Sequence, residues 1–180
     1  DLLFFGDHLA NALAAGQCVR TVYLTGSDAG KGADYRAGRE AGIIRAYDSL
    51  RGATGDWVRS DATLSTGARV TITWPADNPN ISLVFFGLPD GNLNGKGFPA
   101  TGDVSLDQLG SRKVTDLSDL GGSYRIGWHP LVDSVRELIT DFSPASFTTH
   151  MPGSAQDWAK GDHSDHRATG YISRQAWLAA

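Results

Sequence analysis

The sequence has only one cysteine, Cys18, among its 180 residues. It can therefore form no internal disulfide and no cysteine-based metal cluster. It also has no apolar run near the ~20 residues that a membrane-spanning helix needs, since the opening apolar residues 2–5 are followed at once by Gly6. These absences suit a cytosolic and a secreted protein equally, so they leave the compartment open.

Runs of lysine or arginine are absent too, and the net charge is −4. We therefore expect no nucleic-acid partner, because phosphate binding leaves a basic footprint. Apolar residues make up 41% and charged residues 20%, which is ordinary for a soluble domain with one core. The chain starts at Asp1 rather than Met, directly in helix-like sequence, so we expect residues 1–180 to be a single domain cut at both ends.

Motifs for nucleotide binding are missing or incomplete. The glycine-rich loop after Leu24 places only three residues between Gly26 and Gly30, and Gly32 stands where a P-loop needs a hydroxyl. The dinucleotide pattern G-x-G-x-x-G is absent, and so is the G-x-S-x-G elbow of many serine hydrolases. These classes are therefore disfavoured.

Hydrophobic spacing predicts alternating elements along the chain. Helices are predicted at residues 2–15 and 35–50, around 106–109 after a Ser105 cap, at 130–142 and from 163 to the end; strands are predicted at 19–24, 57–58, 69–74, 81–86 and 146–149. The almost continuous apolar run at 81–86 is typical of a strand buried on both faces.

This alternation predicts an α/β fold, a Rossmann-like three-layer α/β/α sandwich with a mostly parallel sheet. Ligands bind such sheets outside the carboxyl ends of the strands. Polar segments follow Leu24, Phe86 and Thr149. We therefore expect a shared site where these segments meet.

The strongest local signal is the hexapeptide at residues 162–167, which reads Asp-His-Ser-Asp-His-Arg. His163 and His166 lie three residues apart at a predicted helix start, so both imidazoles should share one helix face. The positive end of the helix dipole disfavours imidazolium and keeps a histidine able to bind metal. The alternative is a polar helix cap, with Asp162 or Ser164 as the capping residue.

A zinc site needs three protein ligands and an open position, and these residues alone do not complete one. The other candidates are Asp1, His8, His129 and His150. Of these, His8 and His129 are expected at the surface, whereas His150 follows a predicted strand and could line the site.

Several motifs, in the same order along the chain, resemble those of the PIG-L/LmbE-like family of zinc-dependent N-acetyl-sugar deacetylases. Residues 163–166 resemble the family's His-Pro-Asp-His motif, with Ser164 in the proline position. Asp1 resembles the last acid of the family's first motif, His-x-Asp-Asp-(Asp/Glu), and residues 2–5 resemble the apolar stretch after that motif. Residues 22–26, 36–40 and 88–91 resemble its second strand, its Arg-x-x-Glu helix and its aspartate-bearing turn.

The resemblance implies roles for individual residues. His166 would be a zinc ligand, and His163 would stabilise the oxyanion or protonate the leaving amine. Asp165 would orient a histidine. Arg39 or Arg36, together with Asp90, would contact the substrate; without the resemblance, a solvated helix face and a Pro-Asp-Gly turn are the favoured interpretations of these residues.

The implied activity is metal-assisted hydrolysis of the N-acetyl group of an N-acetylglucosamine-type sugar or sugar conjugate, with zinc as cofactor. The resemblance places the first strand, two more zinc ligands and the general base before Asp1, so the chain as given is expected to bind zinc poorly and to be inactive. The alternative is a non-catalytic carbohydrate-binding domain on the same scaffold. An intact upstream His-x-Asp-Asp motif would favour the enzyme, and a degenerate one would favour the binding domain.

Overall fold

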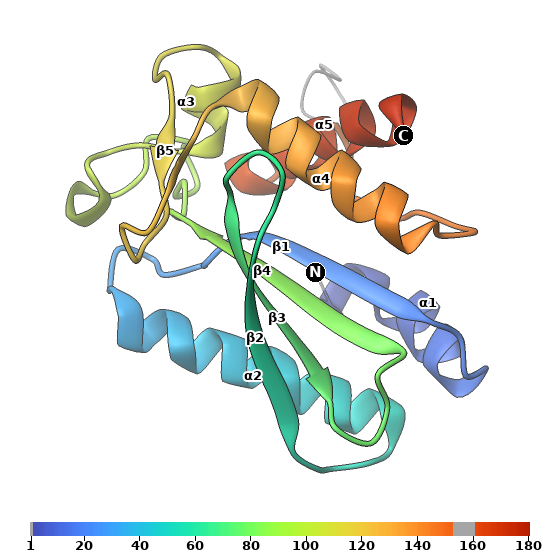
Figure 1. The fold of residues 1–180 in the computed structure, drawn as a ribbon. Coiled ribbons are helices and arrows are strands. Elements are labelled where there is room, and N and C mark those ends of the chain that lie inside the picture. The colour runs from blue at the N-terminus through green and yellow to red at the C-terminus, as the bar shows by residue number, and fades with distance from the viewer. Residues whose placement is uncertain (1, 153–160) are drawn as a thin grey trace.

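A four-stranded mixed sheet forms the centre of the protein, in a computed structural model that describes residues 2–152 and 161–180. Its strands lie in the order β1–β4–β3–β2, where the bounds are Val19–Thr25 for β1, Trp57–Thr63 for β2, Arg69–Pro75 for β3 and Ile81–Leu88 for β4. β1 runs parallel to β4, whereas β3 is antiparallel to both β4 and β2 (Figure 1).

The predicted Rossmann-like sandwich with a mostly parallel sheet is therefore wrong. Among the described strands, β1 and β4 form the single parallel pair of the sheet. Residues 64–68 join β2 to β3, and residues 76–80 join β3 to β4. Connections this short permit antiparallel hairpins, whereas a parallel crossover needs a dozen or more residues.

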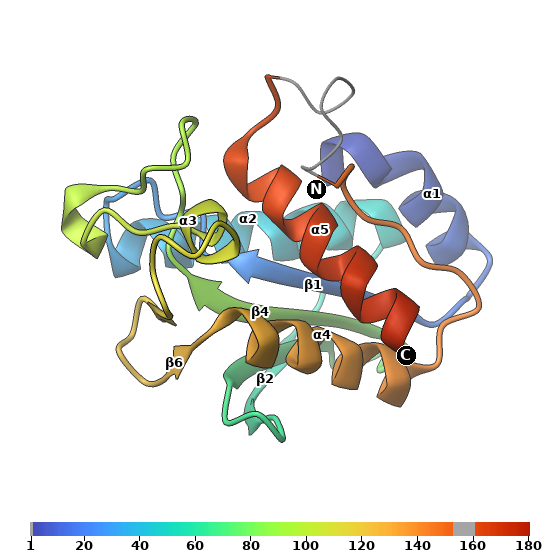
Figure 2. The ribbon, with the colours of Figure 1, turned by 90° about the horizontal axis from the view of Figure 1, so that it is seen from above.

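Helices cover both faces of this sheet (Figures 1 and 2). Helices α1 (Leu2–Ala14) and α2 (Ala33–Arg51) pack on one face, and α4 (Trp128–Phe142) and α5 (Ser164–Ala179) pack on the other. Strand β4 divides its side chains between the two cores, because alternate residues of a strand point to opposite faces. All its residues are buried, which confirms the prediction of a strand covered on both sides.

The smaller elements differ more from prediction. Helix α3 (Leu106–Gly110) is capped by Ser105, whose Oγ accepts a hydrogen bond from the Gln108 N–H, as predicted. The strand predicted at residues 146–149 does not form. A two-residue pair, β5 (Leu117–Ser118) with β6 (Arg125–Ile126), and a 3₁₀ turn at Pro99–Thr101 were not predicted.

None of the helices in the described ranges is long and apolar enough to cross a membrane, in agreement with the sequence.

Helix α5 approaches the segment at residues 150–151 so closely that backbone meets backbone. A Cβ added at Gly170 would lie 2.3 Å from the carbonyl oxygen of His150 and 2.6 Å from that of Met151. Glycine is therefore required here by packing. The contact fixes His150 beside the first turns of α5.

We expect Gly170→Ala to lower the free energy of unfolding by about 1–3 kcal/mol, because the added methyl group forces α5 away from residues 150–151. Gly38→Ala is the matched control: Gly38 lies exposed within α2 with nothing near its Cβ position, so alanine should raise stability by roughly 0.5–1 kcal/mol. Urea denaturation of the three proteins measures both effects. Equal effects of the two substitutions would contradict the close contact.

Candidate functional site

The candidate site lies where the loops after β1 and β4 meet the start of α5. Asp28 comes from the loop after β1, and Asp90 comes from the turn after β4. The predicted meeting of strand-end segments at one edge is therefore confirmed for these two loops. His163 is the N-cap of α5, and the first turn of that helix carries Asp165 and His166.

Asp28 joins the two loops. Its side chain is fully buried; Oδ1 accepts the backbone N–H of Asp90 at 3.1 Å, and Oδ2 accepts that of Gly30 at 3.1 Å. Both carboxylate oxygens thus satisfy backbone donors in the interior. The position of Asp90 depends on this buried carboxylate.

His163 is held in one orientation by the helix that it caps. Its Nδ1 accepts the backbone N–H of Asp165 at 3.2 Å, so the neutral ring carries its proton on Nε2. Nε2 lies 3.9 Å from Oδ1 of Asp90. Burial lowers the pKa of His163 and so favours this neutral form. The alternative caps, Asp162 and Ser164, are not the N-cap residue.

Asp165 is a buried carboxyl group with one side unsatisfied. Its Oδ2 accepts the Gly91 N–H at 2.9 Å, whereas its buried Oδ1 has no hydrogen-bond partner among the described residues. A Cβ at Gly91 would lie 2.4 Å from Oδ1, so glycine is required beneath the carboxyl group. Burial, with the nearby charges of Asp90, Asp107 and Asp28, raises the pKa of Asp165 to about 7.

His166 is oriented by a carboxylate, in the way that metal-binding histidines usually are. Its Nδ1 lies 2.8 Å from Oδ1 of Asp162, a contact that favours the tautomer with the proton on Nδ1 and the lone pair on Nε2. The ring of His150 stacks parallel to it with centroids 4.3 Å apart, and the His163 ring lies 5.5 Å away. Burial lowers the pKa of His150 to about 4, so this imidazole is neutral at pH 7.

These residues fit a divalent cation by charge and by donor type. Asp90, His163 and Asp165 each carry a potential ligand atom, and these atoms lie within 4.8 Å of one another; His163 could coordinate only by giving up the Nε2 proton or the hydrogen bond that its Nδ1 accepts from Asp165. In the described part of the chain, no lysine or arginine forms an ion pair with Asp28, Asp90 or Asp165. Buried carboxylates without a counter-charge are costly, so either a proton or a bound cation compensates them.

The structure brings together Asp90, His163, Asp165 and His166 but leaves both predicted arginines apart from them. Arg39 is exposed on α2. Arg36 pairs with Glu40 and lines a pocket to which none of the clustered residues contributes. His8 and His129 are exposed, as expected. Asp1 lies outside the described residues.

The sequence-based prediction assigned no individual role at the site to three of its residues. The loop after β1 was predicted to reach the shared edge of the sheet, but Asp28 within it was not singled out, although a carboxylate just after a strand is itself a signal. Asp162 was considered only as a cap, although its spacing of four from His166 places it on the same helix face. Gly91 was considered only as part of a turn.

No family model, no curated protein and no solved structure matches this chain. The comparisons therefore neither support nor oppose the family resemblance, and any function must be inferred from the site itself.

We expect the stability of the metal-free protein to fall as pH rises from about 4 to about 7. The folded state keeps the Asp165 proton up to a pKa of about 7, whereas the unfolded chain loses it near the ordinary value of 3.8. Asparagine does not titrate, so Asp165→Asn is the reference. Between pH 5 and pH 8, the free energy of unfolding of the wild type should fall by on the order of 2 kcal/mol relative to that of Asp165→Asn. Urea denaturation with a chelator present measures this, and parallel pH profiles would contradict it.

Proposed function

We propose that this chain contributes the C-terminal part of the site of a zinc-dependent hydrolase that removes the acetyl group from an N-acetylglucosamine-type sugar or sugar conjugate. The observation that carries the proposal is the convergence of His163, His166, Asp165 and Asp90 at the meeting point of the β1 and β4 loops with α5. The resemblance of residues 163–166 to a deacetylase motif supplies the reaction class.

His166 is the metal ligand in this proposal. The Asp162 carboxylate holds Nδ1 and fixes both tautomer and ring direction, so Nε2 is the nitrogen that would coordinate. The stacked ring of His150 limits rotation from the other side. Asp162 and His150 therefore act as positioning residues for His166.

His163 is the hydrogen-bond donor in this proposal, through Nε2–H. Because its Nδ1 accepts the Asp165 N–H, the proton is on Nε2, which lies 3.9 Å from Oδ1 of Asp90. A neutral donor at this place can stabilise the negative charge that develops on an amide oxygen. Asp165 supports this role through its backbone N–H, while its carboxyl group fastens α5 to Gly91.

A bound zinc would supply polarisation of the amide carbonyl and a more acidic water. Two further ligands and the general base are implied by the resemblance to lie before Asp1. With His166 as its one assigned ligand, the 180-residue chain is expected to bind zinc weakly in this proposal.

Zinc binding tests the ligand assignment directly. We expect calorimetric titration of the 180-residue chain to detect one weak site that His166→Ala abolishes. Asp162→Asn should weaken it about 10–100-fold, since it removes the carboxylate that orients the ring. His129→Ala is the control, because that histidine is exposed on α4 away from the cluster. Binding that survives His166→Ala but is lost with His163→Ala would place the metal in the Asp90–His163–Asp165 group instead.

Activity is tested in a form extended upstream of Asp1. If the proposal is correct, the added segment carries a His-x-Asp-Asp motif, and the extended protein holds about one zinc per chain and releases acetate from N-acetylglucosamine derivatives. His163→Ala should lower kcat by about 10²–10³-fold with zinc content unchanged, as expected for loss of one oxyanion donor. A folded extended protein without zinc or activity would overturn the proposal and leave the carbohydrate-binding domain as the better account.

A further inference from the structure

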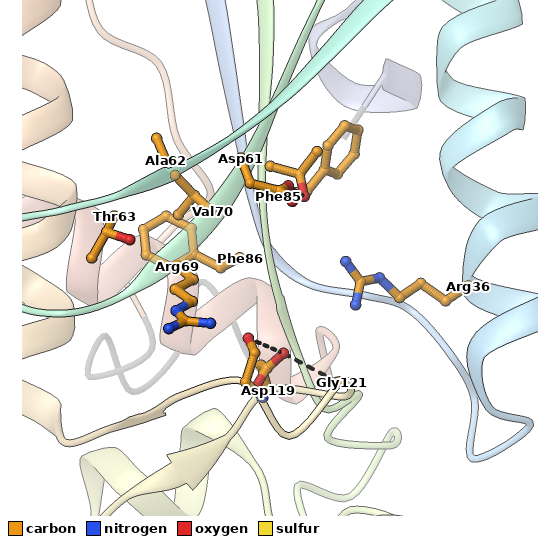
Figure 3. Close-up of a pocket in the computed structure, with 12 residues that line it drawn as sticks. Arg36, Asp61, Ala62, Thr63, Arg69, Val70, Phe85, Phe86, Asp119 and Gly121 are labelled. Atoms are coloured by element: carbon orange, nitrogen blue, oxygen red, sulfur yellow. Dashed lines mark hydrogen bonds between the residues drawn. The ribbon is translucent and has the colours of Figure 1, made fainter.

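A pocket of about 380 Å³ lies next to the sheet, and no residue of the histidine cluster lines it. Four charged side chains surround it: Arg36 from α2, Asp61 from β2, Arg69 from β3 and Asp119 from the loop after β5. Figure 3 shows Arg36 and Arg69 reaching toward the cavity from opposite sides. Its volume lies within the range of small-molecule binding sites.

Arg36 is fixed before any ligand arrives. Its Nε donates to Oε1 of Glu40 at 2.7 Å, and Glu40, which is 7% exposed, also accepts from Arg59 at 3.1 Å. The guanidinium lies against Gly87, where an added Cβ would come within 2.6 Å of Nη1. Glu40 uses only Nε, and no described residue accepts a hydrogen bond from the two terminal nitrogens, so both are donors at the pocket wall.

The two aspartates of the pocket are held by hydrogen bonds to neutral groups, and they do not form ion pairs with the arginines in the described structure. Asp119 accepts hydrogen bonds from its own turn, at the backbone N–H groups of Gly121, Ser123 and Tyr124 and the Ser123 hydroxyl. Asp61 accepts the Thr71 hydroxyl at 2.8 Å through Oδ1. Within the described ranges, no ion pair joins Arg36 or Arg69 to either aspartate.

The charges around the pocket therefore balance, and they offer both donors and acceptors. An anion would meet two carboxylates, and a cation would meet two guanidinium groups. Hydroxyl groups both donate and accept hydrogen bonds. A neutral polyhydroxyl compound can therefore accept from the arginines and donate to the aspartates that line the pocket. We propose that this pocket binds a neutral sugar unit.

If the proposed function is also correct, the substrate contains at least two sugar units. Arg36 packs on Gly87, and Asp90 comes three residues later, so the Cα atoms of Gly87 and Asp90 are at most about 10 Å apart. One ligand could thus place its N-acetyl group at the histidine cluster and a neighbouring sugar in the pocket. This step alone rests on the proposed function; sugar binding by the pocket does not.

The test is a titration of the metal-free 180-residue chain with N,N′-diacetylchitobiose, a neutral disaccharide, followed by amide NMR. We expect the Gly121 and Ser123 amides, which lie at the pocket, to shift on binding. Arg69→Met and Asp61→Asn should each raise Kd by at least about tenfold, as expected for lost hydrogen bonds to charged groups. Both side chains are exposed, so the fold should survive these changes; Arg174→Met, at an exposed position on α5, is the control.

Three outcomes would overturn the inference. The first is an absence of shifts at the pocket amides, and the second is unchanged affinity in Arg69→Met and Asp61→Asn. The third is that inorganic phosphate, used as an anion probe, shifts these amides while the disaccharide does not. The measurement uses metal-free protein and records sugar binding only. A failure of this inference is therefore distinguishable from a failure of the proposed function, which the zinc and activity measurements test separately.

Discussion

The buried carboxylate of Asp28 is the constraint on which the candidate site depends. It accepts the N–H groups of Gly30 and Asp90, and so it fixes the loop after β1 against the turn after β4. The same turn then presents the Gly91 N–H to Asp165, which anchors the first turn of α5. Two buried carboxylates thus connect three segments that are distant in sequence, and His163 and His166 take their positions from this connection.

The same arrangement concentrates negative charge in the interior. Asp28, Asp90 and Asp165 lie close enough to raise the pKa of Asp165, and the described residues provide no lysine or arginine ion pair to any of them. Among the described residues, His163 lies 3.9 Å from both Asp90 and Asp165, and burial lowers its pKa, which favours the neutral ring. Such a cluster is stable when it holds protons or a cation, which is the reason that we connect it with metal chemistry.

Much of the local structure could be predicted from the sequence, and most errors in the predicted fold concern how the strands pair. The four longer helices, the four strands of the main sheet and the Ser105 cap follow from hydrophobic period and capping chemistry, which are local properties. The direction of β3 depends on the length of its connections, and the turns at residues 64–68 and 76–80 were not used to infer hairpins. Residues 146–149 have the composition of a strand, but Phe147 stacks on Trp177 of α5, and these residues pair with no strand of the described chain.

The sequence by itself determined the longer helices, the strands of the main sheet and the chemical types at the site: a histidine pair three residues apart at a helix start, and carboxylates at strand ends. Only the tertiary structure decided which of these residues meet. It placed Asp28 and Asp162 in supporting roles, left Arg39 in solvent and assigned Arg36 to a separate pocket. The physical reason is that helix spacing and capping act within a few residues, whereas burial, charge proximity and the pairing of strands arise between segments tens of residues apart.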